Sequence, residues 1–160
     1  MNEPVNIFNW RRVDDRLTTS GQPTEEQLPA LQQLGVTHII NLGMHDHERA
    51  LPDEQASVTQ LGIEYVHIPV AFDNPTMDSF DKFCEAISDI GDTSVHVHCI
   101  ANLRVTAFLY KYWRDIQGVE ESDARKLMDS VWRPGGVWAK FIGDEKNITL
   151  PHRPPIGAEQ

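Results

Sequence analysis

The apolar positions of the chain alternate between two spacings, and this alternation predicts an α/β fold. Short runs rich in β-branched residues, which are typical of strands, occupy residues 17–20, 36–42, 63–70 and 94–98. Apolar residues at helical spacing follow over residues 24–34, 53–61, 76–90, 102–118 and 121–132, with a last turn at 137–142. Strands that alternate with helices form a mostly parallel central sheet with helices on both faces. We therefore expect one such domain over residues 1–143 and an extended tail over residues 144–160.

The turn after the strand at 94–98 carries the clearest chemical signal in the chain. Cys99 follows this strand directly, and Arg104 lies in the first turn of the next helix. A cysteine at this position faces the positive end of a helix dipole and a guanidinium, and both favour the thiolate form. The backbone N–H groups of the same turn can bind an anion. Ligands of open parallel sheets bind at the carboxyl ends of the strands, so a nucleophile and an anion site are predicted together there.

Composition narrows the partners that this site can have. The chain has 160 residues, 40% of them hydrophobic, which suits one globular domain. A formal net charge of −10 argues against non-specific binding to nucleic acid or to an anionic membrane, and no stretch is long enough to span a bilayer. Cys84 and Cys99 are too few for a disulfide framework, and Cys84 is expected to fill the core. The first residues lack the basic start and apolar run of a signal peptide, so we expect a cytoplasmic protein unless such a peptide was removed.

The sequence around Cys99 resembles a known signature. His98 and Cys99, a short loop, Arg104 and a hydroxyl at Thr106 are similar to the His-Cys-x5-Arg-Ser/Thr signature of cysteine-dependent protein tyrosine and dual-specificity phosphatases. Upstream, Leu-Thr-Thr-Ser-Gly-Gln-Pro-Thr at 17–24 and the segment at 34–42 resemble a bacterial branch of that superfamily, the beta-lactamase-hydrolase-like phosphatases. The resemblance covers roughly residues 10–133 and implies a phosphatase-like fold.

The resemblance also implies roles for the matching residues. The thiolate of Cys99 would attack phosphorus and form a cysteinyl-phosphate, while Arg104 would hold the phosphate oxygens bidentately. His98 would buttress the loop by a hydrogen bond to the backbone, and Thr106 would donate to the sulfur as it leaves. The Thr106 hydroxyl is equally well explained by a hydrogen bond back to the backbone of its own helix. The phosphate-binding loop would comprise His98, Ile100, Ala101, Asn102, Leu103, Val105 and Thr106.

A phosphatase also needs a general acid to protonate the leaving group. The resemblance implies that this acid lies on the loop after the strand at 63–70, where we expect Asp73, with Asp78 in reserve. Asp73 is equally well explained as a turn residue before Asn74 and Pro75. Asp78, at the start of a helix, is more simply explained by the helix dipole.

The loop departs from the signature in two ways, which leaves alternatives open. Arg104 is five residues after Cys99 instead of six, and the usual glycine is missing, although Asn102 is well able to take its left-handed conformation. If the loop keeps the family's length, Val105 takes the place of the arginine. If it is one residue shorter, Arg104 keeps its role, and Cys-x4-Arg is the loop length of rhodanese-type sulfurtransferases, which hold a persulfide. A displaced arginine also fits a pseudophosphatase that binds phosphate without turnover.

Two histidine-containing runs have the ligand types of a metal site. His96, His98 and Cys99 lack an evident further ligand, and the run at 45–48 lies in a polar loop where such side chains are usually solvated. We expect no metal or organic cofactor, because a thiolate, an arginine and backbone amides supply what a metal would. The sequence therefore predicts a phosphatase for phosphotyrosine in a phosphorylated protein or for small aryl phosphates, whose loop can also hold a phosphate or sulfate ion.

Overall fold

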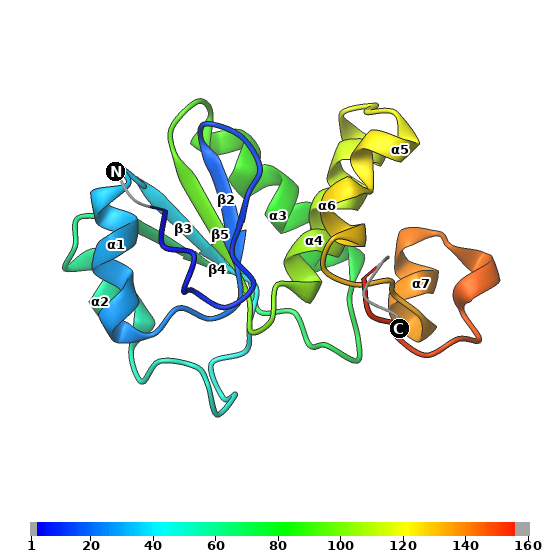
Figure 1. Ribbon diagram of the computed structural model, residues 1–160, viewed down its shortest axis with the longest axis horizontal. Helices are drawn as coiled ribbons and strands as arrows, with labels where there is room; N and C mark the ends of the chain where they lie inside the picture. The colour runs from blue at the N-terminus through cyan, green and yellow to red at the C-terminus, as the bar shows by residue number, and fades with distance from the viewer. Residues whose placement is uncertain (1–2, 156–160) are drawn as a thin grey trace.

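The computed structural model, which describes residues 3–155, confirms the predicted fold class. A five-stranded sheet has the strand order β1-β2-β5-β3-β4 (Figure 1). Strands β2 to β5 run parallel to their neighbours, and only the short β1 at the edge is antiparallel. The strands are β1 (Arg11–Arg12), β2 (Leu17–Ser20), β3 (His38–Asn41), β4 (Glu64–His67) and β5 (Val95–His98). The strand that precedes Cys99 is therefore central, with β2 on one side and β3 on the other.

Helices cover both faces of this sheet. On one face lie α1 (Leu28–Gln33), which follows the 3-10 turn η1 (Glu25–Gln27), and α2 (Glu54–Thr59) (Figure 1). Ile39 of β3 packs there against the buried leucines of α1 and Val58 of α2. On the other face lie α3 (Met77–Ile90) and α4 (Leu103–Lys111), whose phenylalanines pack against the valines of β5. Because side chains alternate along a strand, His96 and His98 face the α1 and α2 side, and Val95 and Val97 face α3 and α4.

The C-terminal helices extend the layer around α4. Helix α4 continues into a π-helical turn, η2 (Tyr112–Ile116), and is followed by α5 (Glu121–Ala124), α6 (Lys126–Asp129) and α7 (Gly136–Ile142). The helix expected over residues 121–132 is thus divided into α5 and α6, with Arg125 between them. Helices α6 and α7 both pack on α4, so the element that starts at the Cys99 turn is also the centre of this layer.

The described part of the expected tail is packed against the domain. It contains a 3-10 turn, η3 (Glu145–Asn147), and Arg153 pairs with Arg133 through two backbone hydrogen bonds of 3.0 Å. The ring of His152 lies edge-on to Phe72 and Trp132, at 5.3 and 5.0 Å between centroids. Residues 144–155 are therefore in contact with the body of the protein, and the rest of the expected tail, residues 156–160, lies outside the described residues. No helix among the described residues is both long and apolar enough to cross a membrane.

Candidate active site

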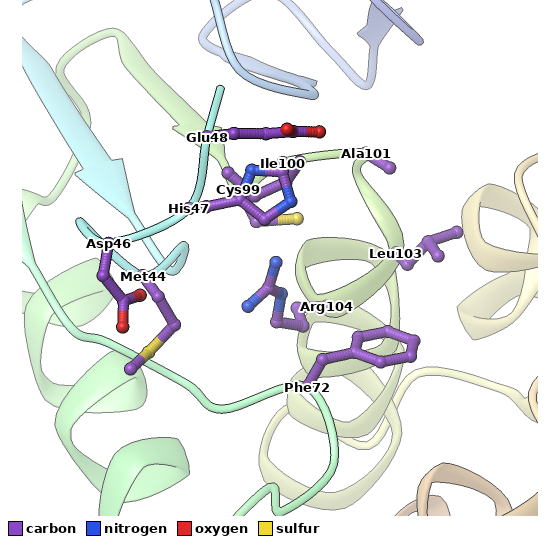
Figure 2. A pocket seen from close by; sticks show the side chains of 10 residues that line it. All are labelled: Met44, Asp46, His47, Glu48, Phe72, Cys99, Ile100, Ala101, Leu103 and Arg104. Atoms are coloured by element: carbon purple, nitrogen blue, oxygen red, sulfur yellow. The ribbon is translucent and has the colours of Figure 1, made fainter. Parts of the chain in front are cut away.

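Cys99 lies at the floor of a pocket at the carboxyl end of the sheet. The pocket has a volume of about 690 Å³. Its wall includes Arg104, Phe72 and Leu103 on one side and the segment from Met44 to Glu48 on the other (Figure 2). Cys99 contributes to the lining of this pocket, although its exposed fraction is 0%. The structure thus brings Cys99 and Arg104 to one cavity.

The backbone of the loop after Cys99 is shaped to hold an anion. Asn102 has φ 68°, the left-handed conformation, and is the N-cap of α4. The N–H of Cys99 donates to Ser20 O at 3.4 Å, and the N–H of Thr106 donates to Asn102 O at 3.3 Å. Between them, the N–H groups of residues 100–105 find no acceptor within residues 3–155. A row of free donors at a helix start is a site for a phosphate or another anion.

The outer side of the loop is fastened to the start of the chain. Nδ2 of Asn102 donates to Asn9 O at 2.9 Å and to Thr19 Oγ1 at 3.0 Å, and Nδ2 of Asn9 donates to Ala101 O at 3.0 Å. The N–H of Gln22 donates to Ile100 O at 3.0 Å. These bonds occupy the carbonyls and leave the N–H groups free, which fixes the loop in the orientation that suits an anion.

Arg104 is held with its guanidinium toward the pocket. The side chain is 7% exposed, Nη1 donates to Val70 O at 2.8 Å, and the guanidinium lies over the ring of Phe72 at 5.7 Å. Nε is buried and has no hydrogen-bond partner among residues 3–155. Figure 2 shows the guanidinium on the same side of α4 as the Cys99 sulfur. A buried cationic donor without an acceptor is costly unless a ligand supplies one, so the side chain is prepared for an anion.

His98 connects the loop to a second buried group, Glu54. Nδ1 of His98 donates to Cys99 O at 3.0 Å, and Nε2 lies 2.6 Å from Oε2 of Glu54. The other carboxylate oxygen accepts from Nε2 of Gln22 at 2.8 Å. Burial acts to raise the pKa of Glu54, but the charge and hydrogen bond of His98, helped by Gln22, outweigh it, and the pKa lies below its usual value of 4.5. The carboxylate form is therefore the one that supports the histidine.

Comparison with known proteins decides the family. A family model described as a dual-specificity-type protein tyrosine phosphatase fused to NAD+ kinase (DSP-PTPase) matches residues 4–135. The chain belongs to this phosphatase family. The match confirms the resemblance seen around Cys99 and places the protein in the superfamily of cysteine-dependent tyrosine and dual-specificity phosphatases.

Individual relatives agree with this assignment. A beta-lactamase hydrolase-like protein of Xylella fastidiosa (strain Temecula1) is 31% identical over 114 residues, which are 69% of this chain and 26% of the relative. The chain thus spans about a quarter of that protein's length. A DUF442 protein from Shewanella putrefaciens CN-32 has 32% identity and a TM-score of 0.75, with 89% of this chain and 95% of that one covered. TpbA of P. aeruginosa, solved in complex with phosphotyrosine, shares the fold at 19% identity and a TM-score of 0.63, over 81% and 75% of the two chains.

The hydroxyl of Thr106 bonds back within its own helix, which is the second of the two interpretations that the sequence left open. It donates to Leu103 O at 3.0 Å and accepts from Nε1 of Trp132 at 3.1 Å. The hydroxyl hydrogen is thus directed into the first turn of α4 rather than toward the Cys99 sulfur. Val105, the alternative occupant of the arginine's place, is fully buried in the core on the α3 and α4 side. Of the two candidates, it is Arg104 that lines the pocket.

The expected acids lie away from the pocket, and an unexpected segment lies on it. Asp73 is exposed and Asp78 forms an exposed ion pair with Lys82 at 3.1 Å; neither lines the pocket of Cys99. Asp46, His47 and Glu48 do line it (Figure 2). Sequence reasoning noted this run only as a metal-like cluster, and its approach to Cys99 could not be seen from its spacing along the chain.

His96 belongs to the buried layer behind the loop. Its Nδ1 lies 2.8 Å from Thr18 Oγ1, its Nε2 lies 2.8 Å from Ser20 Oγ, and its ring stacks on Trp10 with 5.2 Å between centroids. Both ring nitrogens are therefore used by hydroxyl groups. Within residues 3–155, no group of three or more His, Cys, Asp and Glu side chains is placed to hold a metal ion.

Proposed function

We propose that this protein hydrolyses phosphate monoesters of phenols, such as phosphotyrosine, with Cys99 as the nucleophile and Arg104 as the phosphate-binding residue. The observation that carries the proposal is the burial and the incomplete hydrogen bonding of the Arg104 guanidinium. This guanidinium is buried at the pocket of Cys99 and, in the part of the chain that the structure describes, donates from Nη1 to Val70 O while Nε has no partner. Phosphate oxygens are the natural acceptors for such a group, because they match the planar fork of a guanidinium.

The same arrangement supports a cysteinyl-phosphate intermediate. A phosphate that accepts from the N–H groups of residues 100–105 and from Arg104 would have its phosphorus above the sulfur of Cys99. The thiolate then forms the sulfur–phosphorus bond while the bond to the leaving oxygen breaks, and water later releases inorganic phosphate. The donors are fixed before the substrate arrives, so they can stabilise the charge on the equatorial oxygens at little cost in reorganisation.

The pocket walls favour an aromatic leaving group. Phe72, Leu103, Ile100 and Met44 give the pocket its apolar lining above the anion site. An aryl ring can pack on such side chains, whereas a sugar or a polyphosphate gains little there. The complex of TpbA with phosphotyrosine shows that a protein of this fold can accommodate this ligand.

The experiment is the hydrolysis of p-nitrophenyl phosphate by wild type, Cys99→Ser and Arg104→Lys. We expect turnover by the wild type, none by Cys99→Ser, and a large loss with Arg104→Lys, because an ammonium keeps the charge but not the fork. Phosphate release that persists in Cys99→Ser would exclude a cysteinyl-phosphate mechanism. Thermal unfolding of each variant serves as the control for folding.

The Cys-x4-Arg spacing makes a sulfurtransferase the second candidate. The same variants should therefore be tested for transfer of sulfur from thiosulfate to cyanide. Cysteine-dependent formation of thiocyanate without phosphate release would assign the loop to persulfide chemistry. Inactivity in both assays together with phosphate binding would indicate a binding protein.

A further inference from the structure

The wall opposite Arg104 carries three side chains that can bear a proton. Asp46, His47 and Glu48 follow one another on the segment after β3, and all three line the pocket of Cys99 (Figure 2). Asp73, the general acid expected from the family resemblance, is exposed and lies outside that lining. The structure therefore offers a different source for the proton that the leaving group needs.

The reaction geometry limits where the acid can lie. In an in-line displacement the leaving oxygen is on the side of phosphorus opposite the sulfur of Cys99. The turn from Cys99 to Arg104 carries the sulfur, the free N–H groups and the guanidinium that would hold the equatorial oxygens. The acid must therefore come from the walls or the rim, and the segment from Met44 to Glu48 is the wall that bears acidic groups.

His47 is poorly placed to act as this acid. Its Nδ1 accepts a hydrogen bond from the N–H of Arg49 at 3.0 Å, so this nitrogen carries no hydrogen. The single hydrogen of the neutral ring is then on Nε2, and a neutral imidazole does not release it to an alcohol or phenol oxygen. The ring can donate a hydrogen bond to the substrate but does not supply the proton.

The two carboxyl groups differ in direction. Figure 2 shows the carboxyl of Asp46 turned away from Cys99, beside Met44. In the same view the side chain of Glu48 extends across the top of the pocket, above the sulfur of Cys99. Within residues 3–155 the Glu48 carboxyl makes no hydrogen bond or ion pair, so no other side chain competes with a bound substrate for it.

We infer that Glu48 is the general acid and base of the reaction, an inference that rests on the proposed phosphatase function. As the thiolate of Cys99 bonds to phosphorus, the neutral Glu48 carboxyl gives its proton to the leaving oxygen and becomes a carboxylate. The carboxylate then removes a proton from the attacking water, the sulfur–phosphorus bond breaks, and hydrogen phosphate leaves with the thiolate and the neutral carboxyl restored.

Three matched variants test this assignment: Glu48→Gln, Asp46→Asn and Asp73→Asn. Each removes one exposed carboxyl without changing the size of the side chain, and thermal unfolding confirms the fold of each. The substrates are phenyl phosphate, whose leaving group needs a proton, and p-nitrophenyl phosphate, whose leaving group needs it much less. We expect Glu48→Gln to lose about 10²-fold or more in kcat on phenyl phosphate, with a much smaller loss on p-nitrophenyl phosphate. Asp46→Asn and Asp73→Asn should stay within a few-fold of wild type on both.

The pH profile of kcat gives a second reading. The titratable and charged groups that share the pocket with Glu48 are Asp46 and His47 on its own segment and Cys99 and Arg104 across it. The guanidinium of Arg49, the next residue along the chain, lies over the ring of Phe8. In wild type we expect kcat to fall toward alkaline pH, and Glu48→Gln should remove this fall. The change of kcat toward acidic pH should stay as in wild type, because it depends on the other groups. If Asp73→Asn shows the leaving-group effect instead, or if none of the variants does, the assignment of Glu48 is wrong while the phosphatase function stands. If the wild type shows no Cys99-dependent turnover of either substrate, both fail together.

Discussion

Nε2 of His98 lies 2.6 Å from a carboxylate oxygen of Glu54, and the exposed fractions of the two side chains are 0% and 1%. Since Nδ1 of the same ring donates to the carbonyl of Cys99, this contact connects the peptide group of Cys99 to the N-terminal turn of α2. Glu54 is the first residue of α2, which begins there because Asp53 caps the helix by accepting from Ala56 N at 3.2 Å. The cap of a helix on one face of the sheet thus helps to fix the loop at its edge.

Replacing Glu54 by glutamine should destabilise the protein strongly. The amide offers one acceptor where the carboxylate uses two, for His98 and Gln22, and it removes the charge that the imidazole ring faces. Breaking a buried pair by changing one partner costs about 3–5 kcal/mol in the free energy of unfolding. Urea denaturation of Glu54→Gln measures this loss. Glu64→Gln, on the exposed side of β4, is the matched control and should stay within about 0.5 kcal/mol. A similar small effect in both variants would show that the contact contributes little.

The stability of the protein should fall as the pH falls below about 6.5, because of His96. Complete burial, with a smaller contribution from the charge of His98, holds the pKa of His96 well below its usual value of 6.5. In the unfolded chain the ring gains a proton below that pH, whereas in the folded protein it stays neutral, so its contribution is complete above pH 6.5 and declines toward acid. The limiting slope for one proton is about 1.4 kcal/mol per pH unit.

The variant His96→Gln tests the origin of this slope. Between pH 5 and 6.5 its free energy of unfolding should depend on pH less steeply than that of wild type. The difference in slope should be at most that of one proton, about 1.4 kcal/mol per pH unit. Above pH 7 the difference between the two proteins should be constant, because the ring is neutral in both states. Parallel curves over the whole range would assign the acid sensitivity to other groups.

Much of the fold could be predicted because its signals are local. The β-branched strands and the apolar helical faces depend on residues two to four positions apart, and the structure has an element at each predicted place. The predicted helix over 76–90 has its N-cap at Thr76, whose hydroxyl accepts from Ser79 N. The edge strand β1 has only two residues and no periodicity, so the sequence gives no sign of it.

The surroundings of Cys99 were only partly predictable, because they depend on partners far apart in the chain. His98, Cys99 and Arg104 are close in sequence and could be recognised from their spacing. Glu54 lies 44 positions before His98, and in the sequence it looks like any acidic residue in a first helical turn. The hydroxyl of Thr106 accepts a hydrogen bond from Nε1 of Trp132, which lies 26 positions further along the chain. Contacts of this kind are decided by how the sheet and helices pack, which local patterns do not encode.

Gly21 should be intolerant of a side chain, since it packs directly against the loop after Cys99. A Cβ placed there would clash with Ile100 O and would lie 2.8 Å from Cδ2 of Phe8. The loop backbone would have to move, and with it the N–H groups that are proposed to bind phosphate. Gly21→Ala should therefore lower both the free energy of unfolding, by about 1–3 kcal/mol, and the rate of phosphate release. Gly43→Ala is the control and should have a smaller effect. Its Cβ would lie 3.1 Å from Oδ1 of Asn41 and 3.3 Å from Cδ1 of Ile100, and the nearest backbone atom, Cys99 C, would be 3.6 Å away. Equal effects of the two variants would contradict this explanation.

Asn102 should owe its place in the loop both to its backbone conformation and to its side chain, and two variants separate these contributions. Asn102→Gly keeps the left-handed conformation at φ 68° easily but loses the bonds from Nδ2 to Asn9 O and Thr19 Oγ1. Asn102→Ala loses the same bonds and, unlike the glycine variant, keeps a Cβ in that conformation without the polar side chain that makes it tolerable, which costs about 1–2 kcal/mol relative to glycine. Urea denaturation should therefore rank the proteins as wild type, glycine variant and alanine variant, in order of decreasing stability.

Asn74→Ala, in an exposed turn, controls for the loss of an amide alone and should change stability by less than about 0.5 kcal/mol. Phosphate release should follow the same order, because the conformation of Asn102 sets the direction of the N–H groups around the anion site. An alanine variant as stable as the glycine variant would mean that the loop relaxes to another conformation, and the anion site would then have to be described again from that one.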